Sequence, residues 1–114
     1  MELYDSLLGL KASLVETVEH EGVRAALLPW GDGQLELLES IDSDGPVGKF
    51  LERRGEGVHH VCFEVDNVDS EIEELKKKGI QLTRDEARPG LVGMATFVHP
   101  RSARGVLVEI VQKA

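Results

Sequence analysis

The chain has 114 residues and a mass of 12.5 kDa, which is enough for one domain with a real hydrophobic core but not for two. Its net charge of −8 argues against nucleic acid as a partner, because phosphates require a basic surface. The single cysteine, Cys62, excludes an internal disulfide, and no apolar run approaches the length that spans a bilayer. We therefore expect a cytoplasmic protein that binds neither nucleic acid nor membrane.

Hydrophobic periodicity and turn residues divide the chain into short elements. In chain order, the pattern predicts a helix over 1–8, strands over 10–19, 23–30 and 34–39, a helix over 46–54, a strand over 58–65, a helix over 68–78, and strands over 80–83, 94–98 and 106–112. The long helix is the clearest element, with Asp66 as its expected cap and Gly79 at its end. This order is typical of an α+β fold with antiparallel hairpins.

Two stretches of the sequence follow the same order of features, which indicates a duplicated module. In each, a glycine ends a helix and a strand follows, and a later strand carries an internal glutamate. Gly9 and Glu36 are 27 positions apart, and Gly79 and Glu109 are 30 positions apart. The second copy also has a strand before its helix, and the equivalent strand of the first copy would lie ahead of Met1. We therefore expect a single domain over 1–114, with a truncated first module over 1–45, a linker helix over 46–56 and a complete second module over 57–114.

Three residues of this repeat are candidates for chemistry. Glu109 lies inside an apolar strand, where a carboxylate must be paired, protonated or bound to a metal unless it faces solvent. Glu36 occupies the equivalent place in the first copy. A glutamate at this place in both copies is less readily explained by chance than a single one. His60 lies on a third strand and shares one face of it with Cys62. We interpret Cys62 as a small side chain that fills space in the core. His59, Val61 and Phe63 lie on the other face, which we expect to pack in the core. Two carboxylates and an imidazole suit a divalent metal, although a solvent-facing position remains open for each.

At these residues the sequence resembles the vicinal oxygen chelate superfamily (glyoxalases, bleomycin resistance proteins and dioxygenases), and within it the methylmalonyl-CoA epimerase family. The resemblance covers essentially the whole chain. The stretches that carry it are Leu7–Leu10, Glu21–Val23, Leu35–Glu39, Gly48–Leu51, Gly55–Val61, Phe63–Asp66, His99–Ser102 and Gly105–Glu109.

The resemblance implies paired βαβββ modules that enclose one divalent metal ion, which could be Co, Mn, Ni or Zn. His60, Glu36 and Glu109 would be its ligands, with Glu109 and Glu36 as the acid/base candidates. A fourth ligand of the family, a histidine on the opening strand, has no counterpart here, and Ala25 stands where some epimerases have a carboxylate base.

The implied activity is proton transfer between (2R)- and (2S)-methylmalonyl-CoA through an enolate, in a homodimer that binds an acyl-CoA substrate. Two alternatives remain open. One is a lactoylglutathione lyase of the glyoxalase I type, and the other is a non-catalytic small-molecule-binding protein of the same fold.

Overall fold

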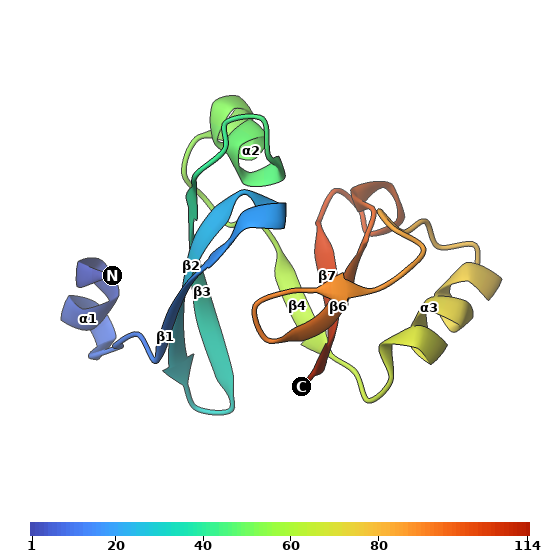
Figure 1. The fold of residues 1–114 in the computed structure, drawn as a ribbon, viewed down its shortest axis with the longest axis horizontal. Helices are drawn as coiled ribbons and strands as arrows, with labels where there is room; N and C mark the ends of the chain where they lie inside the picture. The colour runs from blue at the N-terminus through green and yellow to red at the C-terminus, as the bar shows by residue number, and fades with distance from the viewer. The chain divides into compact units, whose positions relative to one another are not determined.

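Helices and mainly antiparallel strands alternate along residues 1–114, all of which are described by the computed structural model (Figure 1). The predicted α+β class is confirmed. The chain divides into two compact units, Met1–Gly57 and Val58–Ala114, and each carries its own sheet. None of the helices combines the length and the apolar character that crossing a membrane would require.

The first unit is built on a three-stranded antiparallel sheet in the order β1-β2-β3. Its elements are α1 (Glu2–Leu8), β1 (Leu14–Val18), a 3-10 turn (Glu19–Glu21), β2 (Val23–Trp30), β3 (Gly33–Ser40) and α2 (Pro46–Arg54). The strand predicted over 23–30 and the helix predicted over 46–54 have their observed bounds as predicted. Proline at the first position of α2 and Gly55 after its end explain this agreement, because both residues restrict where a helix can run.

Helix α1 covers only part of one face of this sheet. Tyr4 and the following Leu10 pack with Ala26 and Leu28, and Leu28 is fully buried. Three leucines of the helix remain more than half exposed: Leu3, Leu7 and Leu8. The sheet therefore leaves these apolar side chains of α1 uncovered.

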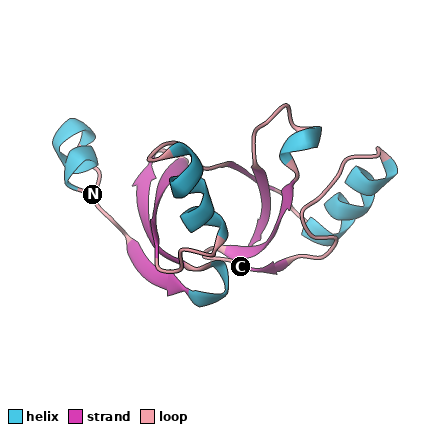
Figure 2. Cartoon of the chain, turned by 90° about the horizontal axis from the view of Figure 1, so that it is seen from above, coloured by secondary structure: helices cyan, strands magenta, loops and turns pink.

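The second unit is built on a four-stranded sheet in the order β4-β7-β6-β5, in which only the β4–β7 pair is parallel. Its elements are β4 (Val61–Glu64), α3 (Val68–Lys77), β5 (Arg88–Pro89), β6 (Gly93–Val98), a 3-10 turn (Pro100–Ser102) and β7 (Val108–Lys113). Figure 2 shows that the strands curl rather than lie flat.

Helix α3 closes the core of the second unit. Its buried residues Val68 and Ile72 pack against Val98 of β6 and Ile110 of β7. The cap is Asn67 rather than the expected Asp66: the Asn67 side-chain oxygen accepts a hydrogen bond from the Ser70 backbone N–H at 3.0 Å.

Two predictions for the second unit are wrong in detail. The strand expected over 80–83 is a single bridge between Leu82 and Val98. The Thr83 N–H donates to the Phe97 carbonyl oxygen and the His99 N–H to the Gln81 carbonyl oxygen, but the Ile80 N–H donates to the Leu75 carbonyl oxygen, so the ladder goes no further. Val61 and Phe63, expected to lie in the core, are 42% and 61% exposed. They lie on the edge strand β4, beyond the part of the sheet that α3 packs against.

The expected repeat is visible in the backbone. Gly9 after α1 and Gly79 after α3 have φ angles of 68° and 75°, a left-handed conformation that glycine adopts most readily. Each unit then ends its sheet with a meander whose last strand carries the glutamate. Glu36 of β3 pairs with Leu27 of β2, and Glu109 of β7 pairs with Phe97 of β6. Each glutamate therefore lies on the last strand of its own meander, although β3 is at the edge of its sheet and β7 lies between β4 and β6.

Candidate functional site

A histidine and a glutamate meet on the second sheet. Glu109 Oε1 lies 3.0 Å from His60 Nε2, and the two side chains are 15% and 11% exposed. Strand β7 carries Glu109 near its start, and His60 immediately precedes β4. The parallel pairing of β4 with β7, with Cys62 opposite Glu109, brings these two parts of the chain together. Two of the three predicted site residues thus form an enclosed pair.

An aromatic ring supports this pair. Phe97 of β6 is the register partner of Glu109 on the side away from β4. Its ring meets the His60 imidazole edge-to-face, with centroids 5.7 Å apart and planes at 79°. Such contacts stabilise aromatic pairs by about 0.5–1.5 kcal/mol beyond the burial of their surface. Phe97 therefore holds the imidazole against Glu109.

A cation lies against the same ring. The Arg84 guanidinium carbon is 6.0 Å from the Phe97 ring centroid, and Arg84 Nη2 donates to the Ala95 carbonyl oxygen at 3.2 Å. The first contact is a cation–π interaction, and the hydrogen bond holds the guanidinium in place beside the ring. The second unit thus presents a positive charge on the ring that supports the histidine.

His59 contacts His60 directly. Their Nδ1 atoms are 3.0 Å apart and their rings are nearly perpendicular, at 88°. Strand alternation predicted that these neighbours face opposite ways, which is wrong because both precede the first residue of β4. Burial lowers the pKa of His59 below the ordinary 6.5; the nearby His60 acts in the same direction, and Glu109 opposes it.

The third predicted residue, Glu36, belongs to the first unit. It is half-buried in the middle of β3, opposite Leu27 of β2. Within either unit taken by itself, no group of three or more His, Cys, Asp or Glu side chains is gathered so that it could hold a metal ion. Within the second unit, the imidazole nitrogen of His60 and the carboxylate oxygen of Glu109 are donors that suit a divalent transition metal. These two donors fit such an ion. The role of Glu36 as a third metal ligand stays a prediction.

Cys62 is exposed rather than buried, so its interpretation as a core filler is wrong. It shares the edge strand with Val61 and Phe63, where neither face of the sheet is covered. The residues that sequence reasoning missed are His59, Phe97 and Arg84. His59 lies in a stretch that carries the family resemblance, but no local motif marks Phe97 or Arg84, which meet His60 directly or indirectly through the strand register.

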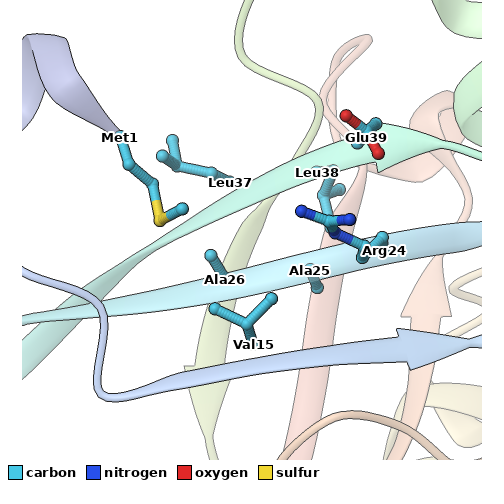
Figure 3. Close-up of a pocket in the computed structure, with 8 residues that line it drawn as sticks. All are labelled: Met1, Val15, Arg24, Ala25, Ala26, Leu37, Leu38 and Glu39. Atoms are coloured by element: carbon cyan, nitrogen blue, oxygen red, sulfur yellow. The ribbon is translucent and has the colours of Figure 1, made fainter.

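A shallow hollow of about 200 Å³ lies on the first sheet (Figure 3). It is lined by Met1, Val15, Arg24, Ala25, Ala26, Leu37, Leu38 and Glu39. Val15, Ala26 and Leu37 are in register across the three strands and form its apolar floor. Glu36 is the neighbour of Leu37 along β3 and so points to the opposite face of the sheet. The hollow therefore does not contain the predicted site residue.

Residues 1–97 match the family model of the Glyoxalase/Bleomycin resistance protein/Dioxygenase superfamily. The chain belongs to this superfamily. One relative, the mouse mitochondrial methylmalonyl-CoA epimerase, is 40% identical to this chain over 111 residues. The matched region covers 96% of this chain and 62% of the mouse protein. The human mitochondrial methylmalonyl-CoA epimerase is 35% identical over 111 residues, which cover 96% of this chain and 63% of the human protein. The chain thus spans somewhat less than two thirds of the length of these mammalian superfamily members.

A solved structure of the superfamily has the same fold over nearly the whole chain. It is a methylmalonyl-CoA epimerase in complex with methylmalonyl-CoA and NH4+, with a TM-score of 0.95 and 38% sequence identity. The alignment covers 99% of this chain and 83% of that one. The similarity is therefore close in both sequence and structure.

Proposed function

We propose that this protein is a methylmalonyl-CoA epimerase that moves the proton on the carbon between the thioester and the carboxylate of its substrate. The enclosed His60–Glu109 pair, with a separation of 3.0 Å, is the observation that carries the proposal. The epimerases to which the chain is similar in sequence and structure support the choice of substrate.

In this mechanism, Glu109 takes or returns the proton. General acid–base catalysis requires a group within hydrogen-bond reach of the proton that moves. The Glu109 carboxylate is 15% exposed, so most of the water that would compete for its oxygens is excluded. Phe97 and His60 restrict where the carboxylate can move, because the ring packs on the imidazole and the imidazole contacts Glu109.

A divalent metal belongs to the same proposal, with His60 and Glu109 as the ligands of the second unit. It would supply Lewis-acid stabilisation of the negative charge that forms when the substrate loses its proton. We assign Glu36 as a third ligand and as the second acid/base candidate because it lies on the last strand of its meander, as Glu109 does in the other unit.

The substrate side of the proposal rests on charge. Methylmalonyl-CoA is an anion, and the protein itself carries a net charge of −8, so substrate binding needs a local positive charge. The Arg84 guanidinium contacts the Phe97 ring, and the same ring contacts His60 of the His60–Glu109 pair. We assign it the role of attracting the anionic acyl group.

The homodimer and the cytoplasmic location are further parts of the proposal. Exposed apolar side chains on α1 and β4 support self-association, because such surface is commonly covered by a partner. They include Leu3, Leu7 and Phe63. Sedimentation of the purified chain at several concentrations measures this directly.

The test is solvent exchange at the reacting carbon. The chain is incubated with (2R)-methylmalonyl-CoA in deuterated buffer, once with Co²⁺ and once with a chelator, and deuterium at that carbon is measured by mass spectrometry. We expect incorporation well above the rate without protein when Co²⁺ is present, and a loss of most of it with chelator. Incorporation equal to the protein-free rate under both conditions would contradict the proposal.

A further inference from the structure

Three side chains of the second unit form a continuous polar chain. Glu109 Oε1 contacts His60 Nε2 at 3.0 Å, and His60 Nδ1 contacts His59 Nδ1 at 3.0 Å. Both nitrogens of the His60 ring are therefore engaged, one on each side. The edge-to-face contact with Phe97 restricts the same ring from a third direction.

The hydrogen positions along this chain follow from the chemistry of the groups. An ionised carboxylate only accepts hydrogen bonds, so His60 Nε2 must carry the hydrogen that faces Glu109. A neutral imidazole has one N–H, so His60 Nδ1 is then an acceptor. The hydrogen between the two rings must come from His59 Nδ1.

We propose that His59 is a positioning residue that fixes the orientation of the His60 ring through the hydrogen bond between their Nδ1 atoms. This inference deepens the proposed function. Its statement about metal binding rests on that function. His59 has no direct contact with the reacting atoms in this account; it acts through His60.

The same pair of rings suits the metal-bound form. A cation on His60 Nε2 requires the hydrogen of that ring to lie on Nδ1, and His59 Nδ1 must then accept it. The hydrogens would balance if such a cation bound: His60 Nε2 would release one to water, His60 Nδ1 would receive one from His59 Nδ1, and His59 Nε2 would take one from water. An imidazole at position 59 can serve both arrangements because its Nδ1 can donate or accept.

Two variants of matched shape test this role. His59→Asn keeps an amide near the place of Nδ1 that can donate or accept, whereas His59→Leu has the same number of side-chain heavy atoms and no polar group. Thermal unfolding of both variants first establishes that they fold. The first measurement is the nitrogen NMR spectrum of the His60 ring in the metal-free protein at fixed pH.

We expect native protein and His59→Asn to show His60 Nδ1 as a hydrogen-bonded acceptor, and His59→Leu to show the shift of an acceptor that has lost its donor. An unchanged Nδ1 resonance in His59→Leu would overturn the proposal. This readout requires neither metal nor substrate, so it separates failure of the His59 role from failure of the proposed function.

The second measurement is the affinity for Zn²⁺ alone, by calorimetry. Loss of a residue that orients a metal ligand weakens binding by about 10–100-fold. We expect a loss of that size for His59→Leu and an affinity close to native for His59→Asn. Equal affinities of native protein and His59→Leu would overturn the role. Absence of Zn²⁺ binding in native protein would count against the metal in the proposed function, and the NMR result would then decide the role of His59.

Discussion

The His60 imidazole is held between Glu109, whose Oε1 lies 3.0 Å from Nε2, and the Phe97 ring, whose centroid is 5.7 Å away. Glu109 and Phe97 are register partners on β7 and β6, so one backbone pairing places both contacts. An antiparallel ladder is a rigid support, and the residue before β4 is brought to it by parallel pairing with β7. The geometry of the pair therefore depends on sheet register more than on local sequence.

Glu109→Gln should abolish most of the proposed activity without unfolding the protein. The amide keeps the size of the side chain and can still contact His60, but it cannot take a proton from the substrate. Removal of a general base typically lowers rates by about 10²–10⁴-fold, which deuterium incorporation into methylmalonyl-CoA would measure.

The matched control for this change is Glu73→Gln on α3. The Glu73 side chain is 67% exposed and pairs only with Lys76 at 3.7 Å, so its loss should leave exchange at the native rate. Equal losses in the two variants would show that a general effect of charge, rather than the role of Glu109, explains the result.

Phe97→Leu should loosen the His60 ring while the sheet stays folded. Leucine retains apolar volume but not the ring that the imidazole meets edge-to-face, so we expect a stability loss of about 0.5–1.5 kcal/mol. Zn²⁺ affinity should fall as well. Phe63→Leu is the control, because Phe63 is 61% exposed on the same sheet. Native Zn²⁺ affinity in Phe97→Leu would contradict the supporting role of the ring.

The sequence predicted those parts of the fold that local chemistry controls. Helix α2 begins at Pro46 and ends before Gly55, and β2 lies between two glycine-containing turns, so their bounds were readable. The strand expected over 80–83 is reduced to one bridge because its backbone hydrogen bonds to the sheet reach only Phe97 and His99, on either side of Val98. Pairing of that kind depends on tertiary structure.

The candidate site divides in the same way. His60 and Glu109 were predicted from the repeat and from a family resemblance, and the structure places their side chains in contact. His59 and Phe97 were missed because their roles come from a bend before β4 and from the β6–β7 register. The alternation of side chains along a single strand predicts neither the bend nor the register.

Asn67→Ala should destabilise the protein by about 1 kcal/mol, the usual cost of losing a helix cap. The Asn67 side chain accepts from the Ser70 N–H at 3.0 Å at the start of α3, which closes the core of the second unit. Asp66→Ala is the control, because Asp66 is an exposed polar residue next to the cap that does not cap the helix itself. Denaturant unfolding of both variants measures the difference, and a larger loss in Asp66→Ala would contradict the assignment.

Gly93→Ala should destabilise the sheet by about 1–3 kcal/mol through overpacking. A Cβ atom at Gly93 would collide with the backbone carbonyl of Gln112 on β7, and the backbone cannot move aside as a flexible side chain can. The Gln112 side chain also accepts from the Val68 N–H at 3.0 Å, so a shift there would disturb the start of α3. Gly57→Ala, where an added Cβ meets no atom within 4 Å, should unfold at nearly the native temperature.

His59 should make the native protein less stable as the pH falls. Burial lowers the pKa of His59 in the folded state below 6.5, the value expected in the unfolded chain, so the unfolded state binds the proton more readily. Its penalty is absent well above pH 6.5, grows as the pH falls through 6.5, and becomes constant below the folded-state pKa. Because carboxylates also titrate in acid, the measured quantity is the difference in unfolding free energy between native protein and His59→Asn. This difference should change in favour of the variant between pH 7.5 and the acid side of 6.5, and a difference independent of pH would contradict the burial of His59.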